Sequence, residues 1–326
     1  TLSSSSAASD VYKRQPEEAA KIVLELLNSS IKKDGKIILA IENKFGLKYF
    51  SGAKEDHTGI QFDSIIGYTN PNTPVTYSKK NLQEILANSG FENQKWFYPY
   101  PDYKLPNVFI SEAAEQDKSL FVHNWIDTPF LDSGKPYKPL FDERLAIKEI
   151  YKSGLLSELS NSFLIVAGKK EKLSEQNWLI KKLNTQRQNN FCTEIKLIEN
   201  NNELLIKRKL LFPQKENQEN ENINYSHKIS DEPYIKGELL TNRLNSYLIS
   251  GNIQQGLIKF SQNLKEFLEQ NYSTQIYDKE GYLILEPDSV DVIFRNIIVT
   301  ENNKWVSFDN EWTHNDKNIT IDYVIF

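Results

Sequence analysis

The chain is organised around residues 36–59, where five consecutive apolar residues, Ile37 to Ile41, follow a Lys-Asp-Gly turn. A short run that is apolar on both faces is typical of a strand buried between two layers, the usual state of a parallel strand in an α/β sheet. Polar residues follow at once, beginning with Glu42 and Asn43. Ligands of open α/β sheets bind beyond the carboxyl ends of the strands. The pattern therefore predicts the floor of an active site at the end of this strand.

Size and charge narrow the class of protein. A chain of 326 residues is long enough for two domains. Its net charge of −5 and the lack of a large basic block make nucleic acid an unfavoured partner. The single cysteine, Cys192, fits a reducing compartment, and we expect a small core residue there rather than a nucleophile. No apolar run approaches the ~18 residues of a membrane span, so we expect a cytoplasmic protein without one.

Both ends of the chain suggest a fragment. The sequence contains no methionine, and residues 1–15 have no pattern that could pack, so we interpret them as a non-native or disordered leader. The last five residues, 322–326, stop inside an apolar run. We therefore expect truncation at both ends.

The first domain, residues 16–172, alternates helices and strands. A helix begins at Pro16, with one apolar stripe at three- and four-residue steps, and ends at Lys33-Asp34-Gly35. The loop from Asn43 to Tyr77 has about thirty-five residues, and loops of that size are usually functional. Ser78 is placed to cap the next helix. Strands are predicted at 91–97, 108–111 and 163–167.

Four segments of this domain come in a recognisable order: KDGKIILAIEN, the helix after Ser78, NSGFENQKWFYPYPDYKLP and FLIVAGK. Together they resemble the distal half of a class I S-adenosylmethionine-dependent methyltransferase, over residues 16–170. The segment IENKFGLKYFSGAKEDHTG is similar to methyltransferases encoded with bacterial cell-surface polysaccharide enzymes. The resemblance implies a Rossmann-like sheet with antiparallel last strands, S-adenosylmethionine as cofactor and a glycan as acceptor. The family's glycine-rich turn and acidic residue lie upstream of this region, so no cofactor-binding residue is assigned.

Methyl transfer to a sugar hydroxyl needs a base near the acceptor oxygen, or a metal. Glu55, Asp56 and His57 supply two carboxylates and an imidazole, and one hypothesis is a base, His57, that a carboxylate holds in place. The alternative is a solvated turn before Gly59. Further candidates for binding the substrate are Asn43 and three tyrosines that could stack on a sugar or simply pack, namely Tyr98, Tyr100 and Tyr103.

The second domain, residues 173–326, has a different character. Two strand-like runs, 191–199 and 203–211, are joined by three asparagines, which is a hairpin signal. Lys207 lies centrally in the second run. An amphipathic helix is predicted from the spacing of Ile253, Leu257, Phe260, Leu264, Phe267 and Leu268.

Residues 291–312, DVIFRNIIVTENNKWVSFDNEW, resemble the catalytic and metal loops of protein-kinase-like and aminoglycoside-phosphotransferase-like folds. The resemblance implies that Asp291 accepts a hydroxyl proton, that Asn296 and Asp309 hold magnesium, and that ATP is the phosphoryl donor. It also implies that Lys207 pairs with the phosphates. Ser289-Val290 stand where the family has His-Arg or His-Gly, and no glycine-rich loop precedes Lys207. An ordinary hairpin, an inactive kinase-like fold and a working phosphotransferase all remain open.

The sequence thus predicts an α/β protein: the distal half of a Rossmann-like methyltransferase sheet, followed by an α+β kinase-like domain. The predicted function is S-adenosylmethionine-dependent methylation of a cell-surface glycan or its precursor. The alternatives are phosphoryl transfer to a glycan by the second domain, and a non-catalytic scaffold that binds a glycan or a partner.

Overall fold

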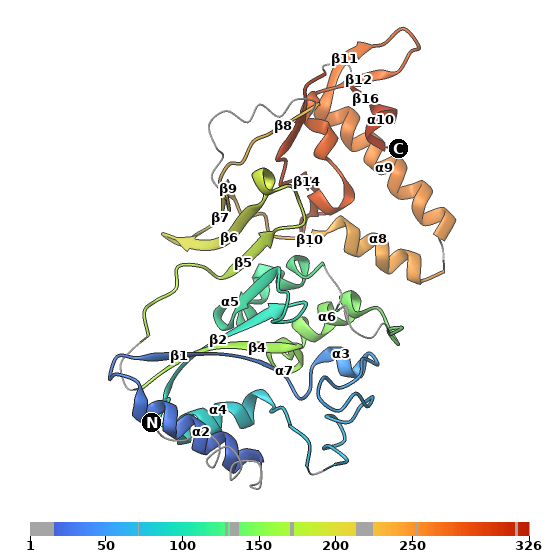
Figure 1. The fold of residues 1–326 in the computed structure, drawn as a ribbon. Coiled ribbons are helices and arrows are strands. Elements are labelled where there is room, and N and C mark those ends of the chain that lie inside the picture. Colours follow the sequence, from blue (N-terminus) through green and yellow to red (C-terminus); the bar gives the residue numbers. More distant parts are fainter. Residues whose placement is uncertain are drawn as a thin grey trace. The chain divides into compact units, whose positions relative to one another are not determined.

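The computed structural model describes residues 16–70, 72–127, 130, 137–169, 173–212, 224–251, 253–316 and 319–325. The predicted leader, residues 1–15, lies outside them. The chain divides into two compact units, which are described separately here (Figure 1). Unit 1 comprises Thr1–Lys118 and Trp125–Lys182, and unit 2 comprises Ser119–Asn124 and Leu183–Phe326. The main division therefore falls after Lys182, whereas the sequence placed it after residue 172.

Unit 1 is built on an antiparallel sheet (Figure 1). The strands are, in spatial order, β1 (Lys36–Glu42), β4 (Ser162–Gly168), β2 (Asn93–Tyr100), β3 (Val108–Ser111) and the beginning of β5 (Ile180–Asn184). Each neighbouring pair in this series is antiparallel. Because β4 runs against both β1 and β2, these two strands point in the same direction. Their carboxyl ends therefore lie at the same end of the sheet, on either side of the beginning of β4.

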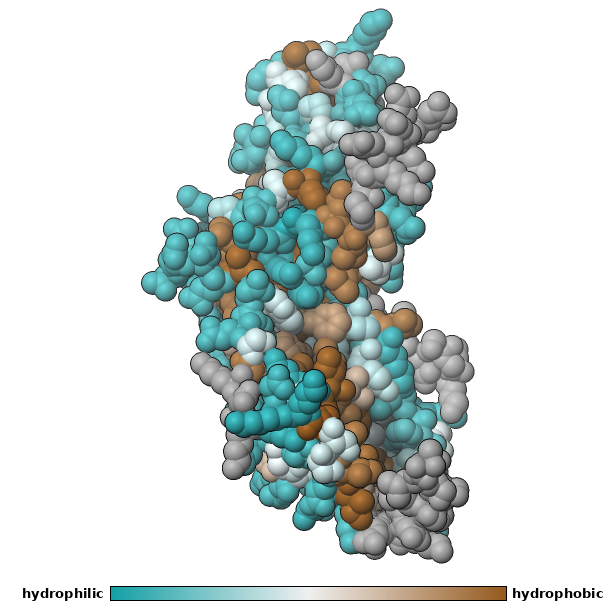
Figure 2. All heavy atoms as spheres, turned by 60° about the vertical axis from the view of Figure 1, so that its left-hand side comes forward, coloured by the Kyte–Doolittle hydropathy of each residue, from teal (hydrophilic) through white to brown (hydrophobic). Residues whose placement is uncertain are grey.

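The environment predicted for β1 is wrong. Its residues alternate between half-buried and exposed positions, and Ile38 is 73% exposed. Among the described residues its only strand partner is β4, in antiparallel register. A continuous apolar run carries no period, so it cannot distinguish a strand covered on both faces from one whose second face is open. Other apolar residues at the surface include Leu26 and Val23 of the preceding helix, and Figure 2 shows such residues gathered in patches.

The helices of unit 1 begin and end largely where local chemistry dictates. The Ser78 side chain accepts a hydrogen bond from the backbone N–H of Asn81, which caps α4 as predicted. Gly90 follows that helix in a left-handed conformation, which favours glycine. The helices are α2 (Pro16–Ser30), α3 (Leu47–Phe50), α4 (Lys79–Asn88), α5 (Glu112–Gln116), α6 (Glu143–Lys152) and α7 (Leu156–Leu159). The chain passes from one unit to the other within the 3₁₀ turns η1 (Lys118–Leu120) and η2 (Val122–Trp125).

Unit 2 begins with the predicted hairpin, which the structure confirms. The turn η3 (Asn189–Phe191) leads into β6 (Thr193–Asn200), which pairs with β7 (Glu203–Leu210); β9 (Glu232–Pro233) continues this sheet. Asn201 and Asn202 adopt positive φ values of 51° and 66°, which asparagine tolerates better than most residues. The asparagine run therefore sets the register of the hairpin.

The rest of unit 2 combines helices with small antiparallel sheets. The predicted amphipathic helix is α9 (Ile253–Tyr272), which buries Leu264 and Leu268, while Ile253 and Leu257 remain exposed. The other helices are α8 (Leu240–Ile249), α10 (Ile321–Ile325) and the 3₁₀ turns η4 (Pro287–Asp291) and η5 (Phe294–Asn296). One sheet contains β10 (Glu238–Leu239), β13 (Ile297–Val299) and β14 (Trp305–Ser307); another contains β11 (Ser273–Tyr277), β12 (Leu283–Leu285) and β16 (Ile319–Thr320). The last pair is β8 (Tyr225–His227) with β15 (Trp312–His314).

The observed architecture is thus mixed α/β with antiparallel sheets. None of the helices that the structure describes combines the length and apolar character needed to cross a bilayer.

Candidate functional site

Unit 1 carries a group of ionised and phenolic side chains just beyond the carboxyl end of β1, which we call the Lys48 cluster. Its members come from the end of β1, from α3 and the loop that follows it, and from the turn between β2 and β3. They are Glu42, Lys48, Tyr49, Asp56, Asp102, Tyr103 and Lys104. The cluster therefore lies where the sequence predicts the floor of a site.

Lys48 is the centre of the cluster and is fully buried. Its Nζ lies 2.7 Å from Asp56 Oδ2 and 2.8 Å from Asp102 Oδ2. The same ammonium lies 4.5 Å from the ring centroid of Phe130. A buried ammonium is tolerated only when carboxylates compensate its charge. The two carboxylates and Lys48 therefore fix one another's positions.

Asn161, the residue before β4, holds the backbone around Lys48. Its Oδ1 accepts a hydrogen bond from the backbone N–H of Lys48 at 2.8 Å, and its Nδ2 donates to the carbonyl of Pro101 at 2.9 Å. One buried amide thus connects α3 to the turn that carries Asp102. This explains how segments far apart in sequence meet at the cluster.

Asp56 is held as a carboxylate. Tyr49 Oη donates to its Oδ2 at 2.6 Å, and Lys104 Nζ lies 2.6 Å from its Oδ1. Burial opposes ionisation, but the charges and hydrogen bonds of Lys48 and Lys104 outweigh it and hold the pKa of Asp56 well below its usual range. A carboxylate with a depressed pKa is a poor proton acceptor near neutral pH and a good acceptor of hydrogen bonds. Asp56 is therefore better suited to positioning a ligand than to acting as the base.

The solvent-facing side of the cluster is formed by Lys104 and Tyr103. The Lys104 side chain is 49% exposed and bridges Glu42 Oε1, at 2.9 Å, and Asp56. Tyr103 Oη donates to Glu42 Oε1 at 3.1 Å, and burial together with the Glu42 carboxylate raises the pKa of Tyr103 to about 12. This side offers an ammonium, carboxylate oxygens and a half-buried aromatic ring. Such groups suit recognition of a polar, hydroxyl-rich ligand.

The expected pairing of His57 with a carboxylate is not formed. Glu55 is buried, and its Oε2 accepts hydrogen bonds from the backbone N–H groups of His57 and Thr58, both at 2.7 Å. That carboxylate therefore fixes the turn rather than the imidazole. The His57 residue is exposed, and its ring has no hydrogen-bond partner in the part of the chain that the structure describes.

Three of the four candidate substrate-binding residues are turned inward. Asn43 is fully buried: its Nδ2 donates to the carbonyls of Glu158 and Ser160, and its Oδ1 accepts from the backbone N–H of Phe45. Tyr98 and Tyr100 are buried in β2, and burial raises the pKa of both phenols. A buried ring cannot stack on a sugar, so the stacking role is left to Tyr103. Sequence reasoning missed Lys48, Asp102 and Lys104, because no spacing rule joins them to Asp56.

The glycine in the turn after β1 does not form a cradle for S-adenosylmethionine. The turn after β1 contains Gly46, but a Cβ added there would lie 3.1 Å from the Cα of Asn161. This glycine therefore permits close packing of two backbone segments and is not part of a cradle for a cofactor. No catalytic step through the cofactor is assigned to these residues.

Unit 2 contains a second group, which we call the Arg208 cluster: Arg187, Arg208, His227, Glu232, Asp309 and Glu311. The Arg208 side chain is only 4% exposed. Its Nη2 lies 2.6 Å from Glu232 Oε1 and 2.8 Å from Asp309 Oδ1, and its Nε donates to the same Asp309 oxygen at 3.1 Å. Burial opposes the charge, but Asp309 and Glu232 outweigh it and raise the pKa of Arg208. The cluster is therefore a compensated, buried cation.

Asp291 and Asn296 connect two loops beside this cluster. Asp291 Oδ2 accepts from the backbone N–H of Glu311 at 2.7 Å, and its Oδ1 accepts from Asn296 Nδ2 at 3.1 Å. The backbone carbonyl of Asn296 accepts from the N–H of Phe308, the neighbour of Asp309. Burial raises the pKa of Asp291. The structure thus brings Asp291, Asn296 and Asp309 into one region.

Lys207 does not join them. Successive residues of a strand point to opposite faces, and Arg208 is the one that reaches Asp309. The Lys207 side chain is 52% exposed, and its Nζ lies 3.9 Å from Asp231. The expectation that Lys207 faces Asp309 is therefore wrong by one residue. Arg208 was overlooked because the family resemblance calls for a lysine.

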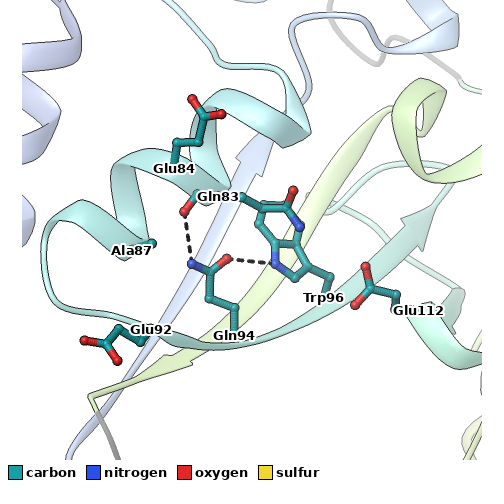
Figure 3. Close-up of a pocket in the computed structure, with 7 residues that line it drawn as sticks. All are labelled: Gln83, Glu84, Ala87, Glu92, Gln94, Trp96 and Glu112. Atoms are coloured by element: carbon teal, nitrogen blue, oxygen red, sulfur yellow. Dashed lines mark hydrogen bonds between the residues drawn. The ribbon is translucent and has the colours of Figure 1, made fainter.

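A hollow of about 420 Å³ lies beside α4 and β2 in unit 1, lined by Gln83, Glu84, Ala87, Glu92, Gln94, Trp96 and Glu112. Three of these residues are linked to one another: the Trp96 indole donates to Gln94, whose amide donates to the carbonyl of Gln83 (Figure 3). None of the predicted site residues lines it. The hollow is therefore separate from the Lys48 cluster.

Comparison of the chain with protein-family models, with curated proteins and with solved structures gives no match.

Proposed function

We propose that unit 1 is the acceptor-binding part of an S-adenosylmethionine-dependent methyltransferase that acts on a cell-surface glycan or its precursor. The observation that carries the proposal is the position of the Lys48 cluster, directly beyond the carboxyl end of β1. The antiparallel course of β4 between β1 and β2 supports the resemblance, which implies antiparallel last strands.

The chemistry of the cluster suits a sugar. Carboxylate oxygens of Glu42 and Asp56 accept hydrogen bonds from hydroxyl groups, the Lys104 ammonium donates to them, and the Tyr103 ring offers an apolar face. We assign His57, on the same loop as Asp56, to acceptance of the hydroxyl proton, since imidazole is the side chain best suited to proton exchange near pH 7. In this proposal the bound acceptor orients the ring. Asp56 and Lys104 then fix the acceptor.

The test is a methyl-transfer assay on the product of the complete reading frame that contains this chain, with radiolabelled S-adenosylmethionine and bacterial surface glycans. We expect His57→Ala and Asp56→Asn to lower turnover by about 10²-fold or more, the usual cost of losing a positioned acid, base or orienting group, with cofactor affinity unchanged. Lys54→Gln, an exposed change in the same loop, is the matched control and should retain the normal rate. Normal turnover in both site variants would refute the proposed site.

For unit 2 the observations weigh against a kinase-like site, because Lys207 points to the face of β7 opposite Asp309. Asp291, Asn296 and Asp309 do lie in one region, as the resemblance implies. The buried Arg208 bound to Asp309 opposes a working phosphotransferase. We therefore propose that unit 2 is a non-catalytic binding or scaffolding module. A cytoplasmic location is part of the same proposal and is compatible with the free, buried thiol of Cys192.

A further inference from the structure

The resemblance of unit 2 to kinases implies that Asn296 and Asp309 bind magnesium. The surroundings of these two side chains can be compared with the coordination that magnesium requires. Magnesium requires near-octahedral oxygen ligands at about 2.0–2.1 Å and is usually bound by one or two carboxylates. In unit 2, Asp309 Oδ1 already accepts hydrogen bonds from two nitrogens of Arg208. The carboxylate that would anchor the metal is therefore bound to a guanidinium.

The guanidinium is a built-in part of the site rather than a surface group that can swing away. The Arg208 side chain is 4% exposed. Besides Asp309 it is held by Glu232, and its Nη1 donates to the carbonyl of Ser230 at 3.0 Å. Glu311 Oε1 lies 3.5 Å from its Nε. Displacing it would leave a buried charge without its carboxylates, which is strongly unfavourable.

A divalent ion on Asp309 would also lie next to this fixed positive charge. Like charges disfavour each other strongly where water is excluded. Among the described residues, no three His, Cys, Asp or Glu side chains are grouped so that they could hold a metal ion. The carboxylates of the Arg208 cluster are instead arranged around a planar fork of donors, the geometry for which arginine is suited.

We propose that the guanidinium of Arg208 occupies the position at Asp309 that a divalent metal ion would need. In unit 2 the cation bound to Asp309 is therefore the arginine and not a metal ion. This inference does not depend on the methyltransferase proposal for unit 1. It predicts that the positive charge of Arg208, and nothing else in the site, keeps divalent cations away from Asp309.

The test is a titration of the full chain with MnCl₂, followed by electron paramagnetic resonance of free Mn²⁺. We expect no binding that depends on Asp309 in the wild type up to about 1 mM, the weak end of protein sites for divalent cations. Arg208→Gln, which keeps hydrogen-bonding capacity and removes the charge, should bind Mn²⁺ at least about tenfold more tightly than the wild type. Adding Asp309→Asn to this variant should abolish the gain.

Two charge controls accompany these variants. Arg208→Lys keeps a cation at the same position and should resemble the wild type. Lys207→Gln removes a positive charge from the neighbouring, exposed side chain and should not increase Mn²⁺ binding. If circular dichroism shows that Arg208→Gln does not fold, the proposal is tested by comparing Mn²⁺ binding to the wild type with Mn²⁺ binding to Asp309→Asn. Submillimolar Mn²⁺ binding by the wild type that Asp309→Asn removes would overturn the proposal, as would a folded Arg208→Gln variant that gains no Asp309-dependent binding.

Discussion

Replacement of Lys48 by methionine tests whether the Lys48 cluster is built around a buried charge. Methionine is close to lysine in length, and its thioether makes favourable contacts with aromatic rings, so the contact with Phe130 is kept. What disappears is the ammonium between Asp56 and Asp102. The substitution therefore removes the charge with little change in packing.

The size of the expected destabilisation follows from the interactions that each carboxylate keeps in the Lys48→Met variant. Asp56 keeps Lys104 and the Tyr49 hydroxyl. Asp102 is buried, and among the described residues it keeps only the hydrogen bond that its Oδ1 accepts from the backbone N–H of Lys104. Breaking a buried pair by removing one partner costs about 3–5 kcal/mol, and because one of the two carboxylates stays compensated we expect about 3 kcal/mol. Amide exchange through global opening of unit 1 should then be roughly 10²-fold faster.

Hydrogen exchange at pH 7 measures this effect unit by unit. Peptides from β2 report on unit 1, and peptides from β13 in unit 2 should not change and serve as the internal reference. Lys104→Met is the matched control: it removes another lysine bound to Asp56, but one whose side chain is 49% exposed. Exposed ion pairs contribute about 0–1 kcal/mol, so its exchange should increase by about fivefold at most.

A double variant separates charge from packing. The loss of stability in Lys48→Met is attributed to the Asp102 carboxylate, which stays buried without its cation. Adding Asp102→Asn to Lys48→Met should therefore restore at least about 1 kcal/mol of the free energy of unfolding, since substitutions at contacting residues are usually non-additive. The reasoning fails if Lys48→Met lowers the opening free energy by less than Lys104→Met does. It also fails if the double variant is no more stable than the single one.

Three further outcomes are expected. Calorimetry should detect weak binding of S-adenosylmethionine to the 326-residue chain, or none, since the glycine after β1 packs against Asn161 and forms no cradle; micromolar affinity would contradict this. Asn43→Ala should destabilise unit 1 by about 2–3 kcal/mol, because it removes the partner of one buried carbonyl, one part-buried carbonyl and one N–H, and an unchanged urea midpoint would return Asn43 to the substrate-binding candidates. Unit 1 should lose stability as the pH falls below about 4: the folded-state pKa of Asp56 lies below the unfolded value of about 3.9, so its contribution is complete above that value and vanishes as the pH falls through the folded one. Asp56→Asn should flatten this dependence in urea titrations between pH 5 and pH 2, and an equally steep loss would assign it to other carboxyl groups.

Local signals in the sequence were sufficient for individual elements. Ser78 caps its helix and Gly90 follows it, because both effects act within a few residues. The asparagines at 201 and 202 fix the hairpin for the same reason. The environment of β1 was not accessible in this way, since an unbroken apolar run does not reveal how many of its faces are covered. Whether a strand lies inside a sheet or at its edge depends on the rest of the chain.

The candidate sites show the same division between local and distant information. Glu55, Asp56 and His57 drew attention through their side-chain types, but the sequence could not show that one carboxylate caps the turn while the next binds two lysines. Likewise, the spacing of Asp291 and Asn296 was informative within its own loop, where the two side chains do bond. The partner of Asp309 was missed by one residue. Alternate residues of a strand point to opposite faces, and the sequence does not show that the face carrying Arg208, rather than the face carrying Lys207, is buried.

The two units share one structural feature, a buried cation that holds distant segments of the chain together. In each, one buried cation binds carboxylates from distant parts of the chain: Lys48 and Asp102 are separated by 54 positions, and Arg208 and Asp309 by 101. Such a pair costs desolvation and adds little net stability compared with apolar packing, yet breaking it is expensive. Its main effect is therefore to fix which loops meet, since a misplaced loop would leave a buried charge unpaired. The residues that assemble each site are for this reason Lys48 and Arg208, although the sequence patterns pointed to neither of them.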